Sequence, residues 1–134
     1  MPHAGKQVLS DSKRGSMSGL RPHYSRWREA NGLVFVSGHL AFDDAGRIHG
    51  TTIAEQTRIC LRNLAATLAA AGLELADVVK TTVWIARKED FPEFNTAYAA
   101  FFPEHPPARS TVVSALAAPG ALVEIEAVAQ RKTG

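Results

Sequence analysis

The sequence predicts one α+β domain in which a mixed β-sheet is packed by two helices, in the order ββαβαββ. Three observations predict this class: two amphipathic stretches with helix-start signals, β-branched runs around them, and turn residues between them. With 134 residues, 46% of them hydrophobic, the chain is long enough for one buried core. We place the domain at residues 20–134 and expect residues 1–19 to form a flexible tail, because they are rich in Ser, Gly and Lys.

A β-hairpin is predicted at the start of the domain. The apolar run GLVFVSGHL, residues 32–40, follows Asn31, and an Asn-Gly pair is typical of two-residue hairpin turns. The stretch HYSRWRE, residues 23–29, comes before this turn. We therefore expect two antiparallel strands here.

The first helix is predicted between Thr52 and Gly72. Thr52 precedes Glu55 by the spacing of a capping box, and Gly72 is a typical residue just beyond a helix end. The apolar residues of this segment fall largely on one stripe: Ile53, Cys60, Leu61, Leu64, Leu68 and Ala71. We expect this stripe to pack on the sheet.

The second helix is predicted within DFPEFNTAYAAFF, residues 90–102. Asp90 is its expected N-cap, Pro92 lies in the first turn, and Glu93 has the capping-box position. Pro103 then closes the helix. An aromatic stripe runs along it: Phe94, Tyr98, Phe101 and Phe102.

Three further strands complete the predicted sheet. Residues 76–87 are rich in β-branched side chains, and alternation predicts one face made of Val79, Thr81, Val83 and Ile85. Residues 108–116 and 121–130 flank a Pro-Gly turn, so we expect these two strands to be neighbours in the sheet.

Composition and motif searches argue against several classes of protein. No apolar stretch reaches the roughly 18 residues of a membrane span, and the N-terminus lacks the apolar core of a secretory signal. Because Cys60 is the single cysteine, no internal disulfide can form, which favours a reducing cytoplasm. The histidines show no HExxH pattern and there is no glycine-rich phosphate loop, so no metal site and no nucleotide cofactor are expected.

Charge is unevenly distributed along the chain. Residues 1–30 hold six Lys/Arg against two acidic residues, a net +4, and residues 31–134 hold nine against eleven, a net −2. A basic arm can contact nucleic acid, but no zinc-finger spacing or aromatic-basic RNP pattern accompanies it. Neither nucleic acid nor a membrane is therefore expected as a partner.

Two charged residues of the last strands are candidates for chemistry. Arg109 is either a solvated edge charge or a guanidinium fork for a carboxylate or phosphate. Glu124 shares a strand face with Glu126, and both are either solvated charges or available to handle protons. If the last two strands are neighbours, Arg109 lies near the same region of the sheet as Glu124, which favours a binding and proton-transfer site.

Four ordered stretches within residues 22–130 resemble the RidA/YjgF/YER057c/UK114 family: NGLVFVSGHLAFD, AEQTRICLRNLAATLAAAGLELADVVKTTVWI, FPEFNTAYAAFFPEHPPARSTV and GALVEIEAVA. The resemblance implies a chorismate-mutase-like fold assembled as a homotrimer, with active clefts between neighbouring protomers. It also implies hydrolytic deamination of reactive enamines and imines, such as 2-aminoacrylate with its 2-iminopropanoate tautomer and 2-iminobutanoate, to 2-keto acids and ammonia.

The resemblance also implies roles for individual residues. Arg109 of the PARS motif binds the substrate carboxylate, and Glu124, which opens the EIEA motif, orients or deprotonates the attacking water. Four further positions match residues that line the site: Tyr24, Gly38, Asn95 and Thr111. The reaction needs no cofactor and no metal, since an imine is already an activated electrophile.

The chain departs from the family pattern at the pocket walls. His23, Arg26 and Trp27 surround Tyr24, and His39 follows Gly38, where it is either a titrating pocket residue or, as we favour, a polar strand-end side chain. Two other functions remain open: that of a ligand-binding or regulatory trimer without turnover, and that of an RNA-acting member of the family.

Overall fold

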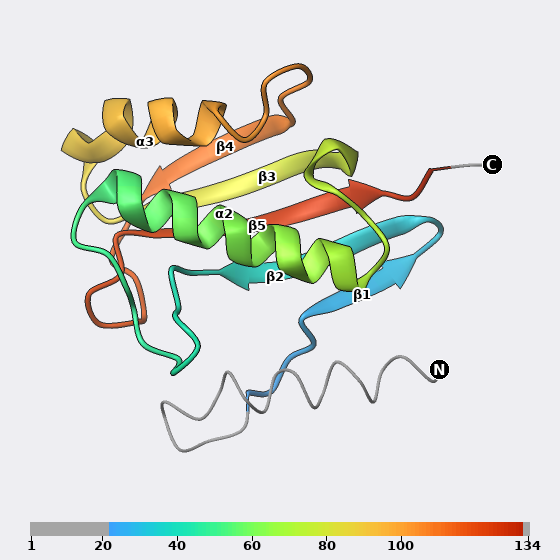
Figure 1. The fold of residues 1–134 in the computed structure, drawn as a ribbon, viewed down its shortest axis with the longest axis horizontal. Coiled ribbons are helices and arrows are strands. Elements are labelled where there is room, and N and C mark those ends of the chain that lie inside the picture. Colours follow the sequence, from blue (N-terminus) through green and yellow to red (C-terminus); the bar gives the residue numbers. More distant parts are fainter. Residues whose placement is uncertain (1–21, 133–134) are drawn as a thin grey trace.

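The computed structural model describes residues 22–132, so the predicted tail at 1–19 and its boundary at residue 20 lie outside the described residues. The order of elements confirms the predicted ββαβαββ arrangement (Figure 1). The elements are β1 (Trp27–Ala30), β2 (Leu33–His39), α2 (Ile53–Ala70), β3 (Val78–Ile85), α3 (Phe91–Ala99), β4 (Ala108–Val113) and β5 (Val123–Gln130). Short 3₁₀ turns at Leu75–Asp77 and Lys88–Asp90 precede β3 and α3.

The five strands form one mixed sheet in the order β1-β2-β5-β3-β4. β3 and β4 are parallel and joined by α3, and the other pairs are antiparallel. The predicted pairing of the last two strands is therefore wrong, because β3 lies between them. Val113 and Val123 both pair with Ile85, from its two sides, so the connection 114–122 crosses the end of β3. A Pro-Gly turn in this connection is thus part of a crossing loop and not of a hairpin.

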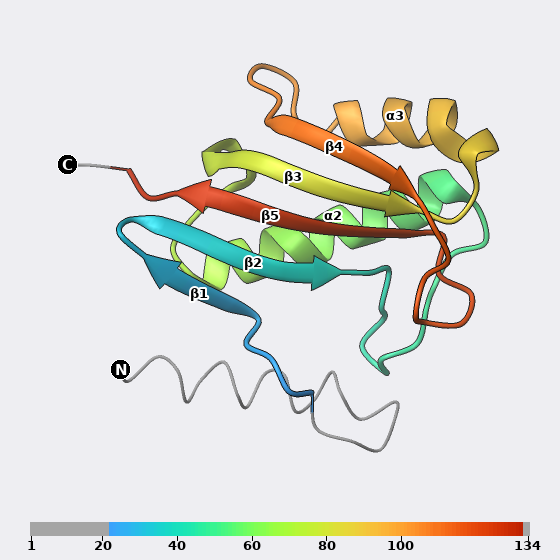
Figure 2. The same ribbon diagram turned by 180° about the vertical axis from the view of Figure 1, so that it is seen from behind.

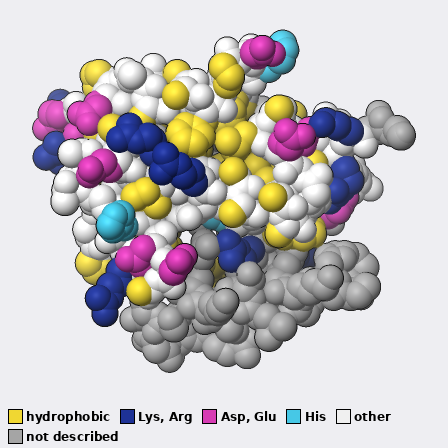
Figure 3. Space-filling model, in the orientation of Figure 1, with side chains coloured by type: hydrophobic (Ala, Val, Ile, Leu, Met, Phe, Trp, Pro, Cys, Tyr) yellow, Lys and Arg dark blue, Asp and Glu magenta, His cyan; other side chains and the backbone are white. Residues whose placement is uncertain are grey.

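Both helices lie on the same face of the sheet, as Figure 2 shows from the opposite side, and the second face has no covering element within the described chain. On the helix-bearing side, charged and hydrophobic side chains are mixed at the surface (Figure 3). The core lies between the sheet and α2, with the predicted stripe of Ile53, Cys60, Leu61, Leu64, Leu68 and Ala71 buried. Within residues 22–132, the sheet thus has one face packed into the core and one face without a covering element.

The predicted turn and helix-capping residues are confirmed by their backbone angles and hydrogen bonds. Asn31 and Gly32 have φ values of 54° and 79°, as expected for a hairpin turn with left-handed residues. Thr52 and Glu55 form the predicted capping box, and Gly72 has φ 81° just beyond α2. These turns fix where β1, β2 and α2 begin and end.

Three local predictions need correction. Val79 is 44% exposed and Val78 is buried, because an irregularity between Val78 and Lys80 shifts the alternation at the start of β3. Asp90 precedes α3 as predicted but makes no capping hydrogen bond, since its carboxylate pairs with Arg87 at 2.8 Å. α3 also ends at Ala99, before Pro103.

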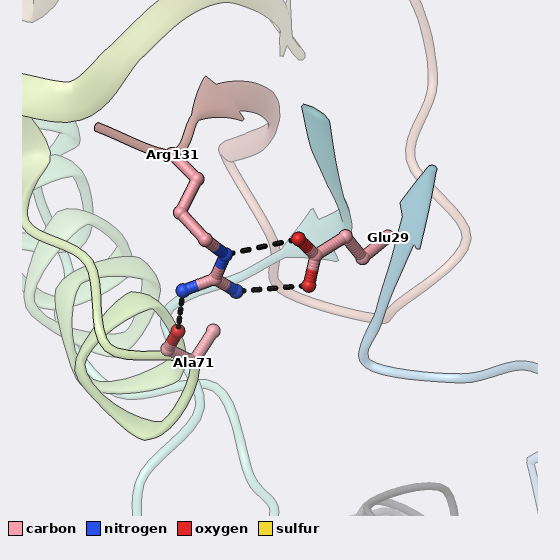
Figure 4. A network of polar contacts seen from close by, with 3 residues as sticks. All are labelled: Glu29, Ala71 and Arg131. Atoms are coloured by element: carbon pink, nitrogen blue, oxygen red, sulfur yellow. Dashed lines mark hydrogen bonds and ion pairs between the residues drawn. The ribbon is translucent and has the colours of Figure 1, made fainter. Parts of the chain in front are cut away.

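The ends of the sheet and of α2 are joined by Arg131, which follows β5 (Figure 4). Its guanidinium donates to both carboxylate oxygens of Glu29 on β1, at 2.9 and 3.0 Å. A third hydrogen bond, of 2.8 Å, reaches the carbonyl oxygen of Ala71 at the end of α2. Bidentate geometry gives this partly exposed pair more fixed orientation than a single contact would.

Candidate functional site

Arg109 lies on β4 with its side chain on the helix-bearing face of the sheet. It pairs with Thr81 of β3, whose side chain is buried under α3. The guanidinium carbon lies 4.8 Å from the ring centroid of Tyr98, 5.5 Å from that of Phe94 and 5.6 Å from that of Phe91. These three rings, here called the aromatic cluster, hold the guanidinium by cation–π contacts and restrict its orientation.

The charge of Arg109 is not neutralised by its surroundings. The hydroxyl groups of Tyr98 and Thr81 are 2.7 Å apart. Burial raises the pKa of Tyr98, although the hydrogen bond to Thr81 and the charge of Arg109 oppose this, so the phenol stays protonated at neutral pH. None of the ion pairs formed within residues 22–132 includes Arg109. The guanidinium is therefore oriented but still available to an external anion.

Glu124 lies on β5 with its side chain on the open face of the sheet, opposite Trp84 of β3. Its carboxylate rests on the backbone of Gly38 in β2. A Cβ added at Gly38 would overlap Oε2 of Glu124 and lie 3.0 Å from the carboxyl carbon. A side chain at this position would therefore displace the carboxylate of Glu124 from the place it occupies here.

The carboxyl group of Glu124 is electrostatically unusual. Partial burial raises the pKa of Glu124 above the ordinary glutamate value, and the negative charge of Glu126 on the same face raises it further. A raised pKa makes the carboxylate a better proton acceptor than a solvated glutamate. Glu124 is therefore suited to general base chemistry.

A β-bulge in β2 creates the position of Gly38. Val36 pairs with Ala127 and His39 pairs with Ile125, so Ser37 and Gly38 together oppose a single residue of β5. The hydroxyl of Ser37 donates to the carbonyl oxygen of Ser25 at 2.6 Å. The amide of Ser37 donates to the carbonyl oxygen of Arg26 at 2.9 Å. The segment before β1 is thereby held beside the bulge.

The other predicted lining residues fall into two groups. Tyr24 is half-exposed and precedes Ser25, whose carbonyl oxygen accepts a hydrogen bond from Ser37, the neighbour of Gly38. Thr111 has the same strand face as Arg109, two residues further along β4, and Asn95 is exposed on α3, one turn after Phe91. We call Arg109, Thr111 and Asn95 the cationic half-site, and Tyr24, Gly38 and Glu124 the acidic half-site.

The two half-sites do not meet within one chain. β3 lies between β4 and β5, and the side chains of Arg109 and Glu124 point to opposite faces of the sheet. The prediction that Arg109 lies near Glu124 in the same region of the sheet is therefore wrong for a single chain. It failed because it rested on pairing the last two strands, and strand partners distant in sequence carry no local signal.

The sequence does not identify the aromatic cluster around Arg109 as part of the site. The only sequence feature that points to it is the aromatic stripe of α3, and such a stripe predicts a buried helix face equally well. His39 is the last residue of β2 and is 1% exposed, with its side chain on the helix-bearing face. It is therefore a polar strand-end residue, as favoured, but a buried one, and it does not face the carboxylate of Glu124.

Other features of the described residues lie apart from both half-sites. One surface cleft of about 320 Å³ is lined by His49, Arg58 and Arg62 among others, and a second of about 520 Å³ lies beside Asp77 and Lys132. No cluster of three or more potential metal ligands occurs within residues 22–132. No helix in this part of the chain is long and apolar enough to cross a membrane.

Comparison with known proteins shows a family relationship over nearly the whole domain. The family model described as Endoribonuclease L-PSP matches residues 19–131. A 2-iminobutanoate/2-iminopropanoate deaminase from Salmonella typhimurium is 37% identical over 112 residues, covering 81% of this chain and 88% of that protein. The chloroplastic Reactive Intermediate Deaminase A of Arabidopsis thaliana is 38% identical over 125 residues, or 92% of this chain, which spans only 65% of the plant protein.

Solved structures support the same relationship at the level of the fold. The crystal structure of E. coli TdcF with bound serine matches with a TM-score of 0.77 and 35% sequence identity, covering 85% of this chain and 92% of that chain. The five-stranded mixed sheet with two helices on one face therefore matches solved structures that include a member of the YjgF/YER057c/UK114 family.

Proposed function

Because the chain belongs to the Endoribonuclease L-PSP family, which is the RidA/YjgF/YER057c/UK114 family that its motifs resemble, we propose that it is an imine deaminase. Its substrates are small enamines and imines that bear a carboxylate, such as 2-aminoacrylate with its 2-iminopropanoate tautomer, and 2-iminobutanoate. Its products are the corresponding 2-keto acids and ammonia. No cofactor enters the reaction.

The observation that carries this proposal is that the guanidinium of Arg109 is held in place but not neutralised. Its guanidinium is oriented by three aromatic rings and has no carboxylate partner within residues 22–132. A planar fork of this kind binds a carboxylate through two parallel hydrogen bonds. Arg109 thus acts as the receptor for the substrate carboxylate, with Thr111 and Asn95 lining the same half-site.

Glu124 handles protons in the proposed mechanism. A water molecule attacks the imine carbon, and Glu124 accepts one of its protons and returns it to the nitrogen, which gives a carbinolamine. The hydroxyl proton of the carbinolamine then passes through Glu124 to the amino nitrogen, the carbon–nitrogen bond breaks, ammonia leaves, and the hydroxyl oxygen becomes the keto oxygen. The raised pKa of Glu124 suits both steps, because the group must accept a proton and release it again.

The half-sites meet, we further propose, between two copies of the chain in a homotrimer. The uncovered face of the sheet carries Glu124 together with large apolar side chains: Phe35 is 46% exposed and Val112 is 41% exposed. Apolar surface of this kind is typical of contacts between subunits. A second copy on this face would bring its own cationic half-site to Glu124, and Tyr24 and Gly38 would line the resulting cleft.

Mixed assemblies test the shared site. Arg109→Ala and Glu124→Ala chains are each expected to be inactive, as measured by keto-acid formation from imines generated in place by a dehydratase. If each site takes Arg109 and Glu124 from different chains, random mixing by unfolding and refolding restores about a quarter of the sites. If mass spectrometry shows mixed trimers that have no activity, the shared site is wrong.

The wild-type protein tests the function itself. A correctly folded trimer that accelerates hydrolysis of neither 2-iminopropanoate nor 2-iminobutanoate would rule out the proposed reaction. Binding of a keto acid without turnover would then favour a ligand-binding trimer, and salt-dependent association with RNA would favour an RNA-acting protein. The cytoplasmic location predicted from the sequence stays a prediction.

A further inference from the structure

His39 makes hydrogen bonds with both nitrogens of its ring, although it is buried. Nδ1 lies 2.7 Å from the carbonyl oxygen of Ser37, two residues earlier in the same strand. Nε2 lies 2.7 Å from the hydroxyl oxygen of Thr67 on α2. The hydroxyl of Thr67 also accepts a hydrogen bond of 2.8 Å from Nη2 of Arg26. A chain of polar contacts thus runs from Arg26 through the buried Thr67 and His39 to Ser37.

The partners of His39 assign its tautomer. The carbonyl oxygen of Ser37 only accepts hydrogen bonds, so Nδ1 carries the hydrogen. Thr67 accepts from Arg26 and still has its own hydroxyl hydrogen, which it donates to Nε2. A second proton on the ring would remove this acceptor. The two hydrogen bonds therefore fit the tautomer of His39 that carries its hydrogen on Nδ1.

The bonds of His39 act on the bulge that shapes the acidic half-site. The ring of His39 holds the carbonyl of Ser37 from inside the bulge, and Ser37 in turn holds the carbonyls of Ser25 and Arg26. Gly38 lies between the two bonded residues, directly beneath the carboxylate of Glu124. A change in the Ser37 peptide would move the surface on which that carboxylate rests.

α2 anchors the same segment from the helix side. The thiol of Cys60 donates to the carbonyl oxygen of His39 at 3.0 Å, and Thr67 binds its ring. α2 therefore holds both the backbone and the side chain of His39. The amide of Asn63 donates to the carbonyl oxygens of Leu40 and Phe42 at 2.9 and 3.0 Å. The bulge is therefore fixed to a long, well-packed helix and not only to its neighbouring strands.

We propose that His39 is a positioning residue for the acidic half-site, which through its bonds to Ser37 and Thr67 keeps Gly38 and the Tyr24 segment in place around Glu124. This inference rests on the proposed function of Glu124 as the base. His39 itself does not touch the substrate, because its ring lies on the opposite face of the sheet. Its effect reaches the reaction through the backbone of the bulge.

Three variants at two positions test the two hydrogen bonds of the His39 ring separately. His39→Ala removes both bonds, whereas His39→Asn keeps an amide N–H close to the position of Nδ1 and so keeps the bond to Ser37. Thr67→Val removes the hydroxyl with little change of shape. Thr57→Val is the matched control on the same helix, since the hydroxyl of Thr57 is buried without a hydrogen-bond partner in the described chain. His49→Ala controls for loss of an exposed histidine.

The kinetic result expected is a selective loss of kcat. His39→Ala should lower kcat by about tenfold to a hundredfold, because a displacement of about 1 Å at a catalytic group costs up to about that factor. KM and the affinity for serine, used as a carboxylate probe, should stay within about twofold, since they depend on Arg109. His39→Asn should recover most of the rate, Thr67→Val should lose less than His39→Ala, and both controls should match the wild type.

A readout independent of turnover completes the test. Carboxyl-carbon NMR should show the pKa of Glu124 closer to its ordinary value in His39→Ala than in the wild type, because a relaxed bulge exposes the carboxylate. If wild-type and His39→Ala proteins share the same kcat and the same titration, His39 does not position Glu124, while the deaminase proposal stands. If the wild type has no deaminase activity, the titration alone decides, and unchanged curves overturn the inference. Should His39→Ala not fold, Thr67→Val must change both readouts.

Discussion

The two half-sites are built in different ways. The cationic half-site lies within the consecutive segment 78–113, where β3, α3 and β4 bring the aromatic cluster against Arg109 through side-chain packing. The acidic half-site combines Tyr24, Gly38 and Glu124, which are distant in the sequence, and depends on backbone geometry at a bulge. In the proposed mechanism, binding of a carboxylate thus relies on a local unit, whereas proton transfer relies on long-range strand pairing.

This difference predicts that substitutions in the two half-sites affect different kinetic parameters. Changes around Arg109 should act mainly on binding of the substrate carboxylate. Changes around Glu124 should act mainly on kcat, because they alter the base and not the anchor.

The largest effect is expected from Glu124→Gln. The amide fills the same space but cannot accept the water proton, so kcat should fall by about 10² to 10⁴. The affinity for serine should change little, as measured by calorimetry. Glu126→Gln is the matched control on the same strand face and should keep kcat at neutral pH. An equal loss in both variants would mean that the charge of this face matters and not the base at Glu124.

Arg109→Lys should produce the next largest effect, on binding. Lysine keeps the charge but loses the two parallel hydrogen bonds, so KM and the dissociation constant for serine should rise by about one to two orders of magnitude. Arg58→Lys, on the exposed side of α2, is the control and should change neither. A fall of kcat at constant KM in Arg109→Lys would contradict the role of an anchor.

Gly38→Ala tests the close contact between backbone and carboxylate. The added methyl group would overlap the carboxylate of Glu124, and overpacking of this kind costs about 1–3 kcal/mol of unfolding free energy. In a Glu124→Ala background the methyl group meets no carboxylate, so the same substitution should cost much less. Denaturant unfolding of the four proteins measures this coupling. Additive costs would show that strain at Gly38 comes from another neighbour.

Tyr98→Phe is expected to have a smaller effect, confined to stability. The hydroxyl pair with Thr81 is lost, which costs about 1 kcal/mol, while the ring beneath Arg109 remains. Tyr98→Leu removes the ring as well and should weaken serine binding, because the guanidinium loses its nearest cation–π contact. If both variants bind serine equally, the ring does not orient Arg109.

The contrast between the half-sites also explains what the sequence could predict. Capping residues, the Asn31-Gly32 turn and the aromatic stripe of α3 act within a few residues, and the elements predicted from them are present. Which strands pair with β5 depends on contacts across the whole chain. The prediction that β4 is a neighbour of β5 was wrong, because β3 lies between them. Alternation along a strand also failed at Val79, because a bulge changes the count without any marker residue.

The same reasoning applies to the site residues. The family resemblance supplied both Arg109 and Glu124, but the argument from strand pairing placed them side by side. The structure instead separates them by β3 and by the thickness of the sheet. The cleft between protomers that the resemblance implies stays a prediction, which the mixed assemblies of Arg109 and Glu124 variants test.

The smallest expected effect concerns pH and sharpens the assignment of the base. Glu124 must be ionised to accept a proton, so kcat/KM should fall at low pH as this group becomes protonated. Its pKa is raised first by burial and then by the charge of Glu126, and Glu126→Gln removes only the second cause. Ionised Glu124 is then less destabilised, its pKa falls, and the acid limb should move to lower pH with the plateau unchanged. Glu104→Gln, in the loop after α3, should leave the limb in place. An acid limb that moves in Glu126→Gln but not in Glu104→Gln therefore reports the charge of the acidic half-site.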